Sequence, residues 1–147
     1  ICESSASGRA SVGAAFRSAA AFGGRAVILQ DRKSPPLTGV LAKAAAGAVE
    51  LIPHVRVVNI GRTIETLRRF GYNTVALEGE AALSLADALT DQRPTAIVVG
   101  AEGKGLRPGV AESCEKRARI PISATMESLN VSVAAAIALY ETARAKS

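Results

Sequence analysis

The stretch ESLNVSVAAAIALYE, residues 127–141, is the segment that decides how the C-terminal part of this sequence folds. From Val131 onward it predicts a helix, because Val133, Ile137 and Tyr140 recur at the i, i+4, i+7 spacing of one helical face. Alanines fill most of the other positions, and a helix that is apolar nearly all round is usually buried on several sides. We therefore expect a C-terminal helix that is covered on more than one side.

Two small polar residues, Ser128 and Asn130, lie just before the start of this helix. Serine and asparagine are favoured helix N-caps, so capping is one interpretation of them. The other interpretation is that they belong to a functional site at the start of the helix. This segment alone leaves both interpretations open.

Working outward from this segment, apolar strand-like runs alternate with helix-like runs along the whole chain. The expected strands are AVILQ, VRVVN, YNTVALEG, TAIVVG and ARIPI, which begin at residues 26, 55, 72, 95 and 118. The expected helices span residues 11–22, 37–49, 60–70, 81–90 and 110–116, and the last begins at 131. Apolar strands that alternate with helices predict an α/β fold, with a parallel sheet flanked by helices on both faces.

Small residues at the ends of the expected helices predict their limits. Ser11 is placed to cap the first helix, and Gly23 with Gly24 is placed to end it. Asn59 is placed to cap the helix over residues 60–70, and Gly71 to stop it.

The composition bounds the possible functions. A chain of 147 residues suits one domain with a single core, and no apolar run approaches the ~20 residues that cross a bilayer, so we expect no membrane contact. Cys2 and Cys114 match no metal or redox spacing and His54 is the single histidine, so we expect reduced thiols, a cytoplasmic protein and no metal site. The net charge of +5 is compatible with a polyanionic partner but indicates it only weakly.

Three loops that follow expected strands have the chemistry of a binding site: ALEGE from residue 76, GAEGKG from 100 and SATMESLN from 123. Ligands of parallel α/β sheets bind outside the carboxyl ends of the strands. The glycines of GAEGKG allow a ligand to approach the backbone closely. The loop fits neither GxxxxGK[ST] nor GxGxxG, and Glu102 would repel a phosphate, which disfavours an ordinary nucleotide or redox protein.

Arg17 lies among alanines in the segment SVGAAFRSAAAFG, residues 11–23. An arginine in such surroundings either extends to solvent along its aliphatic stem or is held ready for an anion such as an RNA phosphate. The segment by itself does not decide between these roles.

Together, the three segments resemble the signature motifs of the SpoU (also called TrmH) family of RNA ribose 2′-O-methyltransferases, within the SPOUT superfamily. The motif NxGAxxRSA corresponds to SVGAAFRSA, a strand running into GxExxG corresponds to VVGAEGKGL, and the third motif corresponds to IPISATMESLNVSVAAAIALYE. The resemblance covers essentially the whole chain. One departure is Ser11, which stands where the family usually has asparagine.

The resemblance implies an architecture and a cofactor that the spacing of residues does not reveal. It implies one catalytic domain over residues 1–147, without the N-terminal RNA-binding domain of many relatives, and a trefoil knot over roughly residues 74–146. It also implies a homodimer whose active site is completed by the partner's arginine. The implied cofactor is S-adenosylmethionine, held largely by backbone groups at Leu77, Gly100, Ile120 and Leu129.

The implied reaction is methyl transfer to a ribose 2′-hydroxyl in structured RNA, either tRNA or ribosomal RNA. The residues that match the family's catalytic positions are Arg17, Glu102, Ser128 and Asn130. Arg17 would grip the RNA phosphate beside the target ribose, and the other three would support it or the substrate. An alternative is a non-catalytic RNA-binding or assembly module that keeps the fold, which Ser11 favours. Transfer to a base nitrogen, or antibiotic resistance through ribosomal RNA, are further alternatives.

Overall fold

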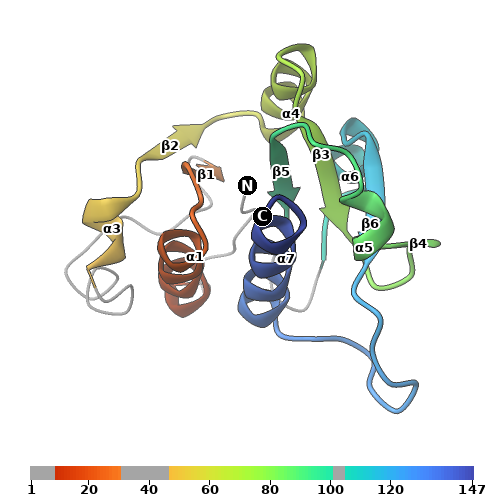
Figure 1. The fold of residues 1–147 in the computed structure, drawn as a ribbon. Coiled ribbons are helices and arrows are strands. Elements are labelled where there is room, and N and C mark those ends of the chain that lie inside the picture. Colours follow the sequence, from red (N-terminus) through yellow and green to blue (C-terminus); the bar gives the residue numbers. More distant parts are fainter. Residues whose placement is uncertain (1–8, 31–46, 101–104) are drawn as a thin grey trace.

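Figure 1 shows the computed structural model of the chain, which describes residues 9–30, 47–100 and 105–147. The helices are α1 (Arg9–Ala21), α3 (Ala48–Leu51), α4 (Ile60–Arg69), α5 (Leu85–Ala88), α6 (Pro108–Ser113) and α7 (Val131–Ala145). The strands are β1 (Val27–Gln30), β2 (His54–Val57), β3 (Asn73–Leu77), β4 (Leu83–Ser84), β5 (Thr95–Val98) and β6 (Lys116–Arg119). Within these ranges, no helix is long and apolar enough to cross a membrane.

All strand pairs are parallel, which confirms the predicted α/β class, but the strands form two sheets instead of one. β1 pairs with β2, and the other strands form a second sheet in the order β4-β6-β3-β5. A small cavity of about 60 Å³, lined by Val27 of β1 and Ile97 of β5 among others, lies where the two sheets approach each other. Because β3, β5 and β6 run in the same direction, their carboxyl ends meet at one edge of the larger sheet.

Helices cover both faces of this sheet, as predicted. Successive side chains of a strand point to opposite faces, and Val75 of β3 belongs to the core cluster that includes residues of α1 and α7. The next residue, Ala76, belongs to the cluster that includes residues of α4 and α6. Figure 1 shows α1 and α7 side by side on one face of the sheet.

The last helix is only partly covered within the single chain, so its predicted cover on further sides stays a prediction. Its buried positions are Ala135 and Ala138, whereas Val133 and Tyr140 are 46% and 50% exposed. The alanines, with the partly buried Val131 and Leu139, pack against the neighbouring core, whereas Val133 and Tyr140 lie on other sides of the helix. Only part of this helix is covered within the described chain.

One of the expected helix limits is wrong, and the limits at Asn59, Gly71 and Gly23 are confirmed. The prediction that Ser11 is an N-cap is wrong, because α1 begins at Arg9. Asn59 does cap α4, since its side-chain oxygen accepts a hydrogen bond from the backbone N–H of Arg62 at 2.9 Å. Gly71 follows α4 with a φ of 90°, a left-handed conformation that favours glycine and ends the helix. Gly23 (φ 73°) follows α1 in the same way.

The remaining elements differ from prediction mainly at their ends. The helix expected over residues 81–90 shrinks to α5 and is preceded by the short strand β4. The helix expected over 110–116 lies earlier, at α6, and Lys116 already belongs to β6. β6 ends at Arg119, just before Pro121, whose missing N–H cannot extend a strand ladder. Most of the helix expected over 37–49 lies outside the described residues.

Candidate functional site

A cavity of about 590 Å³ opens at the carboxyl ends of β3, β5 and β6. Small-molecule sites typically enclose ~300–1,000 Å³, so this cavity is large enough for a ligand of nucleoside size. Its described lining residues are Leu77, Glu78, Gly79, Val99, Gly100, Gly105, Arg119, Ile120, Pro121, Ile122, Ser123, Ala124, Met126, Glu127, Ser128, Leu129, Val131 and Ala134. The site therefore lies where the strand order predicts it.

The structure brings together all four positions that were expected to hold a cofactor. Leu77 ends β3, Gly100 follows β5 by two residues, Ile120 directly follows β6, and Leu129 lies just before α7. All four line the same cavity, although they are spread over more than fifty residues of sequence. The segments around Ile120 and Leu129 are loop, where backbone groups are free to meet a ligand.

Gly100 cannot be replaced by a larger residue without movement of the backbone. A Cβ atom at this position would overlap the carbonyl group of Gly105 and the backbone nitrogen of Leu106. Gly100 and Gly105 therefore lie against each other at the wall of the cavity. This close approach is a physical reason for glycine at the head of the second motif.

Two of the catalytic candidates, Ser128 and Asn130, lie at the N-terminal end of α7. Ser128 is exposed and lines the cavity. Asn130 is the N-cap of α7: its Oδ1 atom accepts hydrogen bonds from the backbone N–H and the hydroxyl of Ser132, at 2.9 and 2.7 Å. Asn130 does not line the cavity. The capping interpretation is thus confirmed for Asn130, and Ser128 stands at the cavity instead of at the cap.

The structure does not bring Arg17 to this cavity. Arg17 is an exposed residue of α1, and among the described residues no hydrogen-bond or ion-pair partner reaches it. Glu102 lies outside the described residues.

Several lining residues were not singled out by the sequence analysis, above all the charged ones. Glu78, Arg119 and Glu127 contribute two carboxylates and one guanidinium to a wall that otherwise consists of apolar, small and glycine residues. The loops containing Glu78 and Glu127 had been noted, because they follow strands. Arg119 was missed, because no local spacing relates it to Ala81 and Ala82, whose carbonyls its side chain contacts.

Apolar side chains and backbone groups give the cavity its chemical character. Leu77, Val99, Ile120 and Leu129 offer surface to an aromatic or aliphatic ligand. Burial raises the pKa of the Cys114 thiol, which does not line the cavity, to about 11, so this buried cysteine stays protonated and unreactive. The cavity is thus suited to binding and orienting a ligand with an apolar part.

Comparison with known proteins identifies the family. A model of the SpoU rRNA methylase family matches residues 7–140. The chain belongs to this family. It is 44% identical over 137 residues to the 23S rRNA (guanosine-2′-O-)-methyltransferase RlmB of Pseudomonas syringae pv. tomato, an alignment that covers 92% of this chain and 54% of that protein. The chain thus spans about half the length of the RlmB sequences that it matches.

Solved structures of methyltransferases have the same fold. The AdoMet-bound rRNA methyltransferase of Sinorhizobium meliloti superposes with a TM-score of 0.86 at 26% identity, over 97% of this chain and 54% of that one. The SpoU methyltransferase AviRb of Streptomyces viridochromogenes gives a TM-score of 0.87 at 23% identity, over 99% of this chain and 57% of that one. The second likeness shows the fold alone.

Proposed function

We propose that this SpoU-family chain transfers a methyl group from S-adenosylmethionine to a ribose 2′-hydroxyl of structured RNA, either ribosomal RNA or tRNA. The observation that carries the proposal is the convergence of Leu77, Gly100, Ile120 and Leu129 on one cavity of nucleoside size. The RlmB relatives, named as 23S rRNA guanosine-2′-O-methyltransferases, support the RNA substrate. The AdoMet-bound Sinorhizobium neighbour supports the cofactor.

The residues present fit such a cofactor. Apolar side chains line the cavity for an adenine ring, and the close approach at Gly100 presents backbone groups at its wall. When bound, the cofactor supplies an activated methyl group on a sulfonium centre. The protein then has to align the ribose hydroxyl with that methyl group and to remove a proton.

Arg17 is assigned to the RNA in this proposal. A guanidinium has a pKa above ~12, so it is a poor free base, but it is well suited to hold the phosphate beside the target ribose. That phosphate accepts the proton while Arg17 stays a guanidinium, or, where shielding from water holds Arg17 as a neutral guanidine, the guanidine accepts it. Ser128 contacts the substrate from the cavity wall, Asn130 orients the start of α7, and Glu102 supports Arg17 or the ribose.

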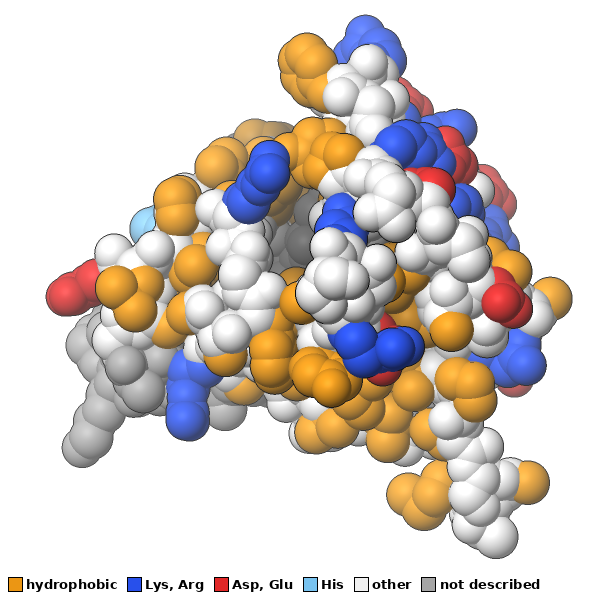
Figure 2. Space-filling model, in the orientation of Figure 1, with side chains coloured by type: hydrophobic (Ala, Val, Ile, Leu, Met, Phe, Trp, Pro, Cys, Tyr) orange, Lys and Arg blue, Asp and Glu red, His pale blue; other side chains and the backbone are white. Residues whose placement is uncertain are grey.

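A homodimer would explain how Arg17 can act at a cavity that it does not line within one chain. Arg17 lies on α1, which packs against α7, and α7 leaves Val133 and Tyr140 half exposed. Phe22 contacts Tyr140 edge to face, with ring centroids 5.6 Å apart, and extends this apolar surface. Figure 2 shows hydrophobic side chains beside α7 on the same face. A second copy that covers this surface would place Arg17 of the partner subunit at the cavity.

The remaining parts of the proposal concern the chain as a whole. Residues 1–147 form a single SpoU-type catalytic domain, with a trefoil knot over roughly residues 74–146. The protein acts in the cytoplasm, which the free, buried thiol of Cys114 supports, since free thiols are typical of reducing compartments.

The experiment that tests the reaction is methyl transfer from labelled S-adenosylmethionine to ribosomal RNA and tRNA, followed by nucleoside analysis for 2′-O-methylation. Arg17→Ala should lower transfer by about 100-fold or more, as removal of an electrostatic catalytic group commonly does, without changing cofactor affinity. Arg25→Ala, an exposed arginine beyond the end of α1, is the matched control. A fully active Arg17→Ala variant would remove Arg17 from the mechanism.

The dimer is tested separately. Val133→Glu places a charge on the exposed side of α7, so it should leave the fold of the single chain intact and yield monomers in sedimentation. Transfer should fall with the loss of the dimer. An unchanged dimer would mean that this surface is not the interface.

A non-catalytic RNA-binding module remains the second candidate function, because Arg17 does not line the cavity within one chain and Ser11 replaces the family's usual asparagine. This candidate predicts RNA binding without transfer at any cofactor concentration. Substitution of Ser11 by asparagine would then be expected to restore transfer if the departure is its cause.

A further inference from the structure

Arg119 links the cavity to a loop that forms one of its walls. It is the last residue of β6, and it lines the cavity. Its Nη1 atom donates hydrogen bonds to the backbone carbonyls of Ala81 and Ala82, at 2.9 and 2.6 Å. These carbonyls belong to the segment of residues 78–82 between β3 and β4, which we call the wall loop. The wall loop contributes Glu78 and Gly79 to the cavity.

Backbone contacts hold the two ends of the wall loop along β6. At its start, the N–H of Glu78 donates to the carbonyl of Ala118 at 2.9 Å. After its end, Leu83 of β4 pairs with the same residue, Ala118. Arg119 supplies the side-chain contact between these two backbone anchors. The path of the wall loop therefore depends on one guanidinium at the rim of the cavity.

We propose that Arg119 is a positioning residue for cofactor binding, which fixes the wall loop in its binding shape before the ligand arrives. This inference rests on the proposed function, because it takes S-adenosylmethionine as the occupant of the cavity. Hydrogen bonds from a charged donor are stronger than those between neutral groups. A loop that is already ordered does not have to be ordered at the expense of binding free energy.

The wall loop has few other means of staying in place. Gly79 and Glu80 are exposed, and Gly79 has no atom within 4 Å of the position of a Cβ, so side-chain packing there is sparse. One internal hydrogen bond, from the N–H of Ala81 to the carbonyl of Glu78 at 3.2 Å, closes a turn. Loss of the Arg119 donor is therefore expected to loosen the wall loop while β6 and the core persist.

The test compares two substitutions at Arg119 with one at Arg117. Arg119→Met keeps the apolar stem and removes the donors, and Arg119→Lys keeps one charged donor. Arg117→Ala removes an exposed arginine from the same strand, two residues earlier, which does not line the cavity. Each variant is titrated calorimetrically with S-adenosylmethionine, its melting temperature is measured, and amide exchange is followed over residues 78–82.

The expected result is a dissociation constant about tenfold higher for Arg119→Met, in line with the loss of a charge-assisted hydrogen bond. Arg119→Lys should lie between this variant and the wild type, and Arg117→Ala should bind like the wild type. Amides of the wall loop should exchange faster in Arg119→Met, with little change in melting temperature.

Four results would overturn the inference. Arg119→Met could bind as tightly as the wild type, Arg119→Lys could bind no better than Arg119→Met, Arg117→Ala could lose as much affinity, or exchange of the wall loop could stay unchanged. In each case wild-type binding would still support the proposed function. Absence of binding by the folded wild-type chain would instead contradict the proposed function itself.

Discussion

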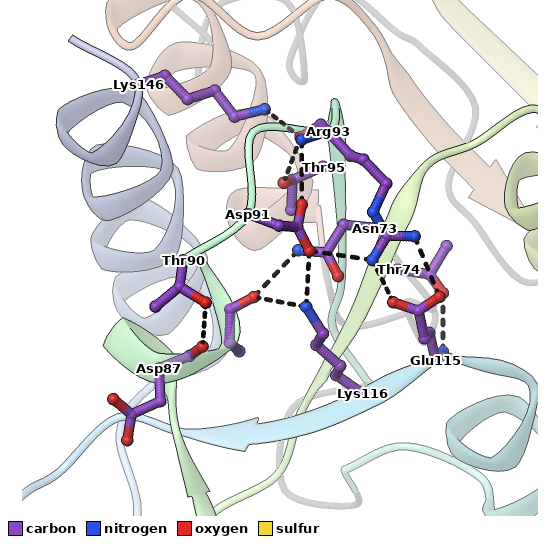
Figure 3. Close-up of polar contacts among 11 residues, drawn as sticks. Asn73, Thr74, Asp87, Thr90, Asp91, Arg93, Thr95, Glu115, Lys116 and Lys146 are labelled. Atoms are coloured by element: carbon purple, nitrogen blue, oxygen red, sulfur yellow. Dashed lines mark hydrogen bonds and ion pairs between the residues drawn. The ribbon is translucent and has the colours of Figure 1, made fainter.

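The two ends of the four-stranded sheet carry different kinds of side chains, although β3, β5 and β6 form both ends. At the amino ends of β3, β5 and β6, charged and polar side chains bond to one another (Figure 3). At the carboxyl ends of these strands, glycines, apolar side chains and backbone groups surround a cavity of about 590 Å³. The comparison teaches that one end fixes how the strands lie side by side, whereas the other end leaves groups free for a ligand.

The network at the amino ends is centred on Asp91. Its carboxylate accepts hydrogen bonds from Arg93 at 3.0 Å and from Lys116 at 2.8 Å. Arg93 also pairs with Glu115, and Lys146 beyond α7 donates to the carbonyl of Arg93 at 2.7 Å. The network thus ties the end of the last helix to the starts of β5 and β6.

Asn73 anchors β3 in this network. Its side chain is fully buried, and its amide nitrogen donates to the carbonyl of Ala88 at 3.0 Å. Lys116 donates to the same carbonyl at 3.2 Å, and Thr74 accepts a hydrogen bond from the N–H of Glu115 at 2.8 Å. Side chains therefore hold the strand starts in register, and no such network of side chains crosses the cavity among the described residues.

The largest effect is expected from a side chain introduced at the carboxyl end. Gly100→Val should abolish binding of S-adenosylmethionine and cost about 2 kcal/mol of stability or more, because the new side chain would overlap the backbone of Gly105 and Leu106. Calorimetric titration and thermal unfolding measure the two effects. Gly109→Ala is the control, since a Cβ at Gly109 in α6 meets nothing within 4 Å. Wild-type affinity in Gly100→Val would show that this wall does not touch the cofactor.

A smaller loss of stability is expected at Asn130, where two substitutions separate its role as an N-cap from a role in catalysis. Asn130→Ala removes the N-cap of α7 and should cost about 1 kcal/mol of stability. Asn130→Asp keeps an acceptor for the N–H of Ser132, so its stability should stay close to that of the wild type. If the amide group of Asn130 also serves catalysis, Asn130→Asp should lose methyl transfer. Full transfer by a stable Asn130→Asp variant would reduce Asn130 to a cap.

The smallest loss of stability is expected from a substitution at the amino ends of the strands, and this loss depends on pH. Hydrogen bonds from Arg93 and Lys116 hold the pKa of Asp91 well below its usual value. A carboxyl group of this kind stabilises the fold above its unfolded pKa of about 3.9, and this contribution is lost as the pH falls below that value. Asp91→Asn should therefore lower stability at pH 7 by about 0.5–1 kcal/mol, since the pairs are partly exposed.

Unfolding measured from pH 7 down to pH 3 tests this expectation. The stability of Asp91→Asn should fall less steeply in acid than that of the wild type, and its cofactor affinity at pH 7 should be unchanged. Asp87→Asn is the control, because this exposed carboxylate of α5 forms no ion pair within the described part of the chain. A loss of cofactor affinity in Asp91→Asn would contradict the separation between the two ends of the sheet.

The sequence predicts the cavity end better than the amino-end network for a physical reason. Leu77 ends β3, Gly100 and Ile120 follow strands, and Leu129 precedes α7. The resemblance to the SpoU family indicates all four residues, and the loops noted after the expected strands already contain Leu77, Gly100 and Leu129. The network depends instead on which strand starts become neighbours in the order β4-β6-β3-β5. That order is set by tertiary packing, and no local spacing reveals it.

Three particular differences have the same origin. The buried side of α7 could not be inferred, because alanines make the helix apolar on several sides and leave its periodicity weak. Arg119 was missed because its partners, Ala81 and Ala82, come from a different strand connection. Ser11 was expected to cap a helix that begins two residues earlier, at Arg9.

The central claim is that the cavity at the carboxyl ends of the strands binds S-adenosylmethionine, and calorimetric titration of the chain with this cofactor tests it most directly. The account predicts saturable binding by the wild type, undiminished binding by Arg17→Ala, and none by Gly100→Val. No binding by a folded wild-type chain, or equal binding by Gly100→Val, would contradict it.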